Sequence, residues 1–161
     1  MSSEKNKEVK LSEVLKDKFI VLNLQGKTKK EILIELVDLI GRSKKLKNKK
    51  MFLAALMKRE ALGSTGIGDG VAIPHAKSDA TKSFVLAFGR KQEGIDFGAL
   101  DGEKTYLFFV LASPEKEVGA HLKILAEISR LVKDKYTVER LKKAKDKKEI
   151  LKIISLVPKT L

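Results

Sequence analysis

The 161-residue chain contains no cysteine and no tryptophan, and it has only three prolines and two histidines. Without cysteine it cannot form disulfides, use a thiol nucleophile or hold a metal through thiolates. No apolar run approaches the ~20 residues that cross a bilayer. The first ten residues, MSSEKNKEVK, lack the apolar core of a secretory signal. These absences predict a cytoplasmic protein that does not insert directly into a membrane.

Positive charge predominates, with 34 Lys and Arg against 21 Asp and Glu and a net charge of +13. Such an excess is common in proteins that bind nucleic acids. Here it lies towards the ends: residues 1–50 carry 14 basic and 7 acidic side chains, residues 101–161 carry 14 and 9, and residues 51–100 carry 6 and 5. The basic runs also lack interleaved aromatic residues. We therefore expect solvated lysine-rich surfaces and no specific nucleic-acid partner.

Three long stretches have the apolar spacing of helices. Thr28 and Glu31 form a capping-box pattern before a stretch that ends at Gly41, and Asn48 is placed to cap a second helix. A third helix is predicted over residues 119–134, with one buried stripe. The predicted stripe comprises Leu122, Leu125, Ile128 and Val132. Two short helices are expected after it, starting near Thr137 and near Asp146.

Strands are predicted where apolar residues run without interruption. Residues 83–89 and 105–112 form the longest such runs, and shorter strands are expected at 19–23 and 71–75. Residues 93–102 have the Asp and Gly content of a loop. Uninterrupted apolar runs suit strands that are covered on both faces, so helices should pack on both sides of the sheet. The sequence therefore predicts an α/β three-layer sandwich.

The segment REALGSTGIGDGVAIPHAK, residues 59–77, is rich in glycine and ends near a Pro-His pair. It does not fit a P-loop, because Asp69 and Gly70 stand where Lys and Ser or Thr are required. Val71 occupies the third glycine position of a dinucleotide fingerprint, so that alternative fails as well. Two histidines without an HExxH pair indicate no metal site, and GSTG lacks the GxSxG frame of hydrolases.

The same segment suits the binding of an anion, because glycine lets backbone N–H groups approach a ligand closely. Ser64 and Thr65 add hydroxyl donors, and Arg59 can reach a phosphate with its planar guanidinium. Pro74 restricts the backbone immediately before His75. An imidazole with a pKa of ~6.5 is largely neutral and nucleophilic at neutral pH. The residues therefore favour phosphoryl transfer to a histidine.

The pattern RE-x-L-GSTGIG-x-G-VAIPH resembles the signature of the enzyme IIA domains of the bacterial phosphoenolpyruvate-dependent sugar phosphotransferase system (PTS). The resemblance is to the fructose/mannitol type, which includes the nitrogen-related regulators. It extends to HLKIL at 121–125 and to the order of elements over about residues 11–157. It implies a single EIIA type-2 domain at 11–161 after a flexible polar segment at 1–10. It also implies a mixed sheet of about five strands between helices, and no metal or organic cofactor.

The resemblance implies a role for particular residues. His75 matches the histidine that accepts a phosphoryl group from phospho-HPr, as a tele-phosphohistidine. His121 matches a second histidine that supports the phosphorylated ring, and Arg59 matches the arginine that stabilises the phosphate charge. Substrate contacts are expected from Ser64, Thr65 and Gly66. Asp69 stands where many relatives have Asn, and because Asp also tolerates a left-handed backbone, we expect the turn to be kept.

Three functions remain open. The first is a phosphotransferase that passes the phosphoryl group to a separate IIB component of a fructose/mannitol-like sugar transport system. The second is a regulatory phosphoprotein of the nitrogen-related branch, which controls a partner through its phosphorylation state. The third is a binding module with a basic surface for an acidic partner, against which the intact histidines argue. Docking of HPr needs exposed apolar residues near the loop, for which Ile67 and Phe97 are candidates.

Overall fold

A six-stranded mixed sheet lies at the centre of the structure, a computed structural model that describes residues 10–156. The long strands β5 (Val85–Ile95) and β6 (Thr105–Ser113) are antiparallel neighbours. The path runs β1-β5-β6-β3-β2, and β4 also pairs with β6. The short strands are β1 (Ile20–Val21), β2 (Gly66–Gly68), β3 (Val71–Ala72) and β4 (His75–Lys77).

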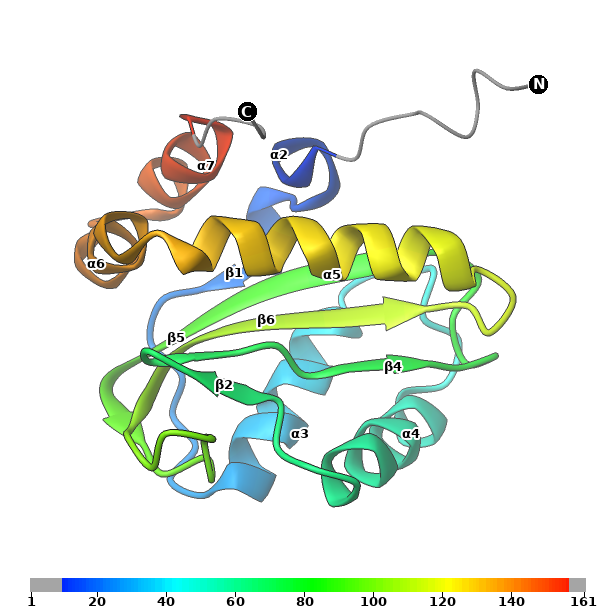
Figure 1. Cartoon of the computed structure of the whole chain (residues 1–161). Helices are drawn as coiled ribbons and strands as arrows, with labels where there is room; N and C mark the ends of the chain where they lie inside the picture. The colour runs from blue at the N-terminus through cyan, green and yellow to red at the C-terminus, as the bar shows by residue number, and fades with distance from the viewer. Residues whose placement is uncertain (1–9, 157–161) are drawn as a thin grey trace.

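Helices cover both faces of the sheet (Figure 1). One face carries α3 (Lys29–Ile40) and α4 (Lys49–Ala61), and α5 (Val118–Lys133) crosses the other. Beyond α5 lie α2 (Leu11–Val14) and α7 (Lys147–Leu156), and α6 (Lys135–Lys143) follows at the C-terminal end of α5. A 3-10 turn at Asp17–Phe19 precedes β1. The predicted α/β sandwich is confirmed, with one strand more than the five expected.

The predicted caps begin α3 and α4. Thr28 Oγ1 accepts a hydrogen bond from the Glu31 N–H at 3.1 Å, and the Glu31 carboxylate accepts one from the Lys27 N–H at 2.8 Å. Asn48 Oδ1 accepts a hydrogen bond from the Met51 N–H at 2.9 Å. Each cap satisfies N–H groups that have no partner inside the helix. Both helices therefore start where the sequence predicts.

Proline divides the strand that the sequence predicts at 71–75. Pro74 has no N–H to donate, so β3 and β4 flank it and both continue in parallel along β6. Two other segments also differ from the prediction. The glycine-rich segment contributes the edge strand β2, and β5 continues to Ile95, into the stretch expected to be a loop.

Phe97 is buried, and the prediction that it is exposed is wrong. Its ring contacts Phe108 edge to face at 5.2 Å between centroids, and the Lys29 ammonium lies 4.6 Å from the ring centre. The loop after β5 folds back on the glycine-rich segment, with the Leu100 N–H donating to the Gly66 carbonyl at 3.0 Å. This return of the loop carries Phe97 into the core.

The buried stripe of α5 is also rotated from the predicted one. Leu122 is 59% exposed, and Leu125 is only partly buried. Ile128 and Val132 are buried as expected. The buried residues of the helix are His121, Ile124, Ile128, Leu131 and Val132. The first turn of α5 therefore turns a histidine inward and a leucine outward.

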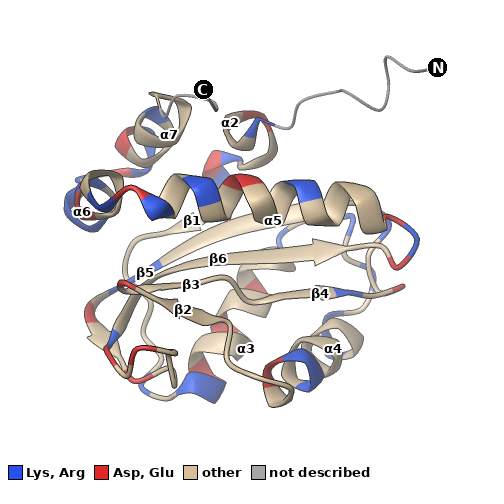
Figure 2. Cartoon of the chain, viewed as in Figure 1, with Lys and Arg blue, Asp and Glu red and all other residues tan. Residues whose placement is uncertain are grey.

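Charged residues lie mainly on the helices and loops, and β6 contains none (Figure 2). Its apolar side chains form the centre of the core, together with those of β5. Within residues 10–156, no helix is both long and apolar enough to cross a membrane.

Candidate functional site

A cleft of about 600 Å³ brings together Arg59, His75 and His121. Arg59 lies in the last turn of α4, His75 begins β4, and His121 lies in the first turn of α5. The two imidazole rings are 5.5 Å apart between centroids and tilted by 54°. Three side chains that are distant in sequence therefore line one cleft, as the sequence predicts for a shared site.

The backbone before Pro74 orients the His75 ring. His75 Nδ1 lies 2.7 Å from the Ile73 carbonyl oxygen. Because a carbonyl can only accept, Nδ1 carries the proton and Nε2 keeps its lone pair. Burial lowers the pKa of His75 below 6.5, and the Arg59 charge lowers it further, although the Ile73 hydrogen bond opposes this. The ring is thus neutral at neutral pH, with a nucleophilic Nε2.

His121 is buried in the wall of the cleft, with 4% of its surface exposed. Its Nδ1 lies 2.7 Å from the hydroxyl oxygen of Ser113, the last residue of β6. Burial lowers its pKa to about 4, and the positive charge of His75, when that ring is protonated, and of Lys77 adds to this shift. His121 is therefore neutral at neutral pH, and a hydroxyl contacts one of its two ring nitrogens.

Arg59 supplies positive charge to the cleft. One guanidinium nitrogen donates a hydrogen bond to the Gly63 carbonyl at 2.9 Å. A guanidinium has five N–H donors, so this bond leaves donors for an anion. Lys58 and Lys77 also line the cleft. The arrangement can attract and hold a phosphoryl group beside His75.

The other residues expected to contact the substrate have hydrogen-bond partners within the protein. Thr65 donates both its N–H and its hydroxyl to the Glu60 carboxylate. The Ser64 hydroxyl donates to the Phe97 carbonyl at 3.2 Å and accepts from the Gly66 N–H at 3.0 Å. None of Ser64, Thr65 and Gly66 is among the residues that line the cleft. Their contact with a phosphoryl group stays a prediction.

Sequence reasoning missed two buried polar residues next to this site, Glu60 and Ser113. The Glu60 carboxylate accepts from Thr65 and forms an ion pair with Lys29 Nζ at 2.8 Å, which ties the glycine-rich segment to α3 and α4. A glutamate at the end of a helix ordinarily remains in solvent, so its residue type does not predict that Glu60 is buried. Only its position next to Arg59 in the sequence pointed to the site. Nothing in the sequence pointed to Ser113, because a serine before Pro114 is typical of a strand end.

Exposed apolar side chains surround the cleft. Leu62 is 82% exposed and Leu122 is 59% exposed, and Met51 is also exposed. Ile67 is 45% exposed on β2, as predicted, although it does not line the cleft. Exposed leucines of this kind are typical of a surface that docks another protein.

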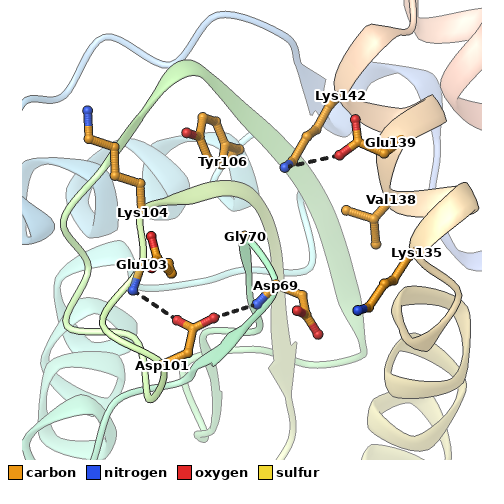
Figure 3. Close-up of a pocket in the computed structure, with 10 residues that line it drawn as sticks. All are labelled: Asp69, Gly70, Asp101, Glu103, Lys104, Tyr106, Lys135, Val138, Glu139 and Lys142. Carbon is orange, nitrogen blue, oxygen red and sulfur yellow. Dashed lines mark hydrogen bonds and ion pairs between the residues drawn. The ribbon is translucent and has the colours of Figure 1, made fainter.

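A second pocket, of about 520 Å³, lies between the β2–β3 turn and α6 (Figure 3). Asp69 and Gly70 have φ angles of 55° and 80°, the positive pair of a type I′ turn, which confirms the expected left-handed Asp69. The Asp69 N–H donates to Asp101 Oδ2 at 3.0 Å, so the turn is fixed to the next loop. Asp69 lines this pocket and not the histidine cleft. Residues 10–156 hold no group of three or more His, Asp or Glu side chains that could bind a metal ion.

Comparisons with known proteins show which family this chain matches. Residues 13–156 match the family described as phosphoenolpyruvate-dependent sugar phosphotransferase system, EIIA 2. A nitrogen regulatory protein of Bradyrhizobium diazoefficiens is 33% identical over 93% of this chain and 97% of its own length. A fructose-specific EIIABC component of Bacillus subtilis is 34% identical over 91% of this chain, which spans only 23% of that protein. The crystal structure of the nitrogen regulatory protein IIA-Ntr from Neisseria meningitidis is 33% identical, with a TM-score of 0.84 over 89% of this chain and 98% of that one.

Proposed function

Because the chain belongs to the EIIA 2 family of the phosphoenolpyruvate-dependent sugar phosphotransferase system, we propose that it is a phosphocarrier. His75 accepts a phosphoryl group from phospho-HPr and passes it to the IIB component of a fructose/mannitol-like transport system. The observation that carries this proposal is the bond between His75 Nδ1 and the Ile73 carbonyl. It leaves Nε2 as the nucleophile, so the product is a tele-phosphohistidine.

The transfer exchanges one phosphorus–nitrogen bond for another. The Nε2 lone pair of His75 forms the new bond, and the electron pair of the broken bond stays on the donor's imidazole nitrogen. The Nδ1 proton remains on His75. Because the phosphorylated ring gains positive charge, its hydrogen bond to the Ile73 carbonyl strengthens during the step.

Arg59 and His121 act on the phosphoryl oxygens. The Arg59 guanidinium balances their negative charge without any proton transfer, since it stays charged. His121, neutral and buried in the wall of the cleft, lies beside His75 and can hydrogen-bond the phosphoryl group. Phosphoryl transfer requires mainly positioning and charge stabilisation, and these residues supply both.

A regulatory phosphoprotein of the nitrogen-related branch is the second candidate. It is favoured by the nitrogen regulatory relative, which matches this chain over nearly its whole length. A phosphoryl group adds about −1.5 to −2 charges, enough to change the binding of a partner at the apolar rim around Leu62 and Leu122. The chemistry at His75 would be the same, and only the recipient differs.

Intact-mass spectrometry tests the shared step. The protein is incubated with phosphoenolpyruvate, enzyme I and HPr, beside a His75→Ala variant and with an EIIA of established activity as the positive control. We expect one acid-labile phosphoryl adduct on the wild type and none on the variant. An adduct that persists in His75→Ala would refute the assignment of the acceptor.

The two candidates separate in a second experiment. Phosphorylated protein is mixed with purified IIB of a fructose or mannitol system, and loss of its adduct is followed by mass. Transfer at a rate comparable to the positive control supports the transport role. Retention of the adduct, together with binding of a cellular partner that depends on phosphorylation, supports regulation.

A further inference from the structure

The hydroxyl of Ser113 lies at the Nδ1 edge of the His121 ring. Ser113 ends β6 and is fully buried, and its carbonyl accepts from the Ser78 N–H at 2.8 Å, which fixes its backbone. Its Oγ is 2.7 Å from His121 Nδ1. Ser113 and His121 therefore form a short hydrogen bond, and the position of one proton decides which of them is the donor.

The surroundings decide which atom donates. Among residues 10–156, Ser113 Oγ has no hydrogen-bond partner other than His121 Nδ1. If Nδ1 donated, the serine proton would be left without an acceptor in the interior, which is costly. If the hydroxyl donates, both groups are satisfied and Nδ1 needs no proton.

We propose that Ser113 is a positioning residue that donates its hydroxyl proton to His121 Nδ1 and thereby holds His121 with its proton on Nε2. The second nitrogen then presents an N–H group on the side of the ring opposite Ser113. His121 acts on the reaction, and Ser113 acts only through it.

The consequence for phosphoryl transfer rests on the proposed function. With its proton on Nε2, a neutral His121 can donate to a phosphoryl oxygen on His75, whose ring centre is 5.5 Å away. With the proton on Nδ1, it would present a lone pair to those oxygens and repel them. The serine therefore selects between a supporting and an opposing form of the same neutral ring.

Nitrogen-15 NMR of the histidine rings tests the proposal without any phosphoryl donor. In the wild type at pH 7.5, we expect the shift of an unprotonated nitrogen at His121 Nδ1 and that of a protonated one at Nε2. Ser113→Ala should move the two shifts towards each other, and Ser113→Thr, which keeps the hydroxyl, should restore them. A wild-type His121 protonated on Nδ1, or shifts that Ser113→Ala leaves unchanged, would overturn the proposal.

Thr105→Val serves as the matched control, since it removes another buried hydroxyl from the opposite end of β6. We expect it to leave the His121 shifts where they are. Transfer from phospho-HPr then gives an independent readout, in which Ser113→Ala should be about tenfold slower and Ser113→Thr close to wild type. A normal rate in Ser113→Ala would also overturn the role. Absence of transfer to the wild type would refute the proposed function and leave the NMR result standing.

Discussion

Replacing His121 should remove a large part of the acid sensitivity of folding. The pKa of His121 is about 4 in the folded protein, chiefly because the ring is buried, against 6.5 for an unperturbed histidine. Between these two values the unfolded chain binds a proton at this position and the folded chain does not. Stability contributed by the neutral ring is therefore lost as the pH falls from 6.5 towards 4.

The size of the effect follows from the shift. A change of one pKa unit corresponds to about 1.36 kcal/mol, so a shift from 6.5 to about 4 gives ~3 kcal/mol. His75 contributes in the same direction, because burial lowers its pKa as well. The comparison must therefore be made between the wild type and a variant that changes only one ring. His121→Gln keeps a neutral polar side chain and has no proton to gain in this range.

Urea unfolding followed by circular dichroism at pH steps from 7.5 to 4 measures the effect. The difference in unfolding free energy between the wild type and His121→Gln should change by ~3 kcal/mol over this range, with the wild type losing more. Proton NMR of the His121 ring gives the pKa directly. Parallel stability curves for the two proteins, or a His121 ring that titrates near pH 6.5, would refute the reasoning.

Three further variants can be checked by urea unfolding at pH 7.5. Thr105→Val should raise the unfolding free energy by about 1 kcal/mol, because Thr105 Oγ1 is buried without a partner among the described residues; a loss of stability would show that the hydroxyl is bonded. Glu60→Gln should cost about 2 kcal/mol, since it leaves Lys29 without its ion-pair partner, and an unchanged midpoint would contradict that role. Arg90→Met should cost about 2 kcal/mol, because the Arg90 guanidinium donates to three carbonyls at the end of α6, and the loss should appear as faster hydrogen exchange in α6.

The parts of the fold that could be predicted are those set by local chemistry. The caps at Thr28 and Asn48 act within a few residues, so their patterns locate the starts of α3 and α4. The apolar run at 105–112 needs cover on both faces, which predicts a central strand between layers of helices. Asp69 tolerates a left-handed backbone by its residue type, and its φ of 55° agrees with that expectation.

The errors concern contacts between segments that are distant in sequence. Phe97 is buried because its loop returns to the glycine-rich segment, and nothing near Phe97 in the sequence marks that return. Leu122 has the spacing of a core residue in α5 and is exposed at the edge of the cleft instead. The apolar spacing of α5 predicts a helix whose inward face packs only against the core. Here the first turn also lines the cleft, with His121 buried and Leu122 exposed.

The chemistry of the site depends on features that no motif contains. The sequence identifies two histidines as candidates, but it does not show which ring nitrogen of each carries the proton. Each neutral ring has two tautomers, and only one combination of them suits the proposed phosphoryl transfer. A backbone carbonyl before Pro74 fixes the proton of His75 on Nδ1, which makes Nε2 a nucleophile. In the proposal above, the Ser113 hydroxyl holds the proton of His121 on Nε2, which makes that nitrogen a donor. Because the two rings share a cleft, these opposite tautomers would give the proposed transfer one atom that attacks phosphorus and one that binds its oxygens, with both rings neutral before the step.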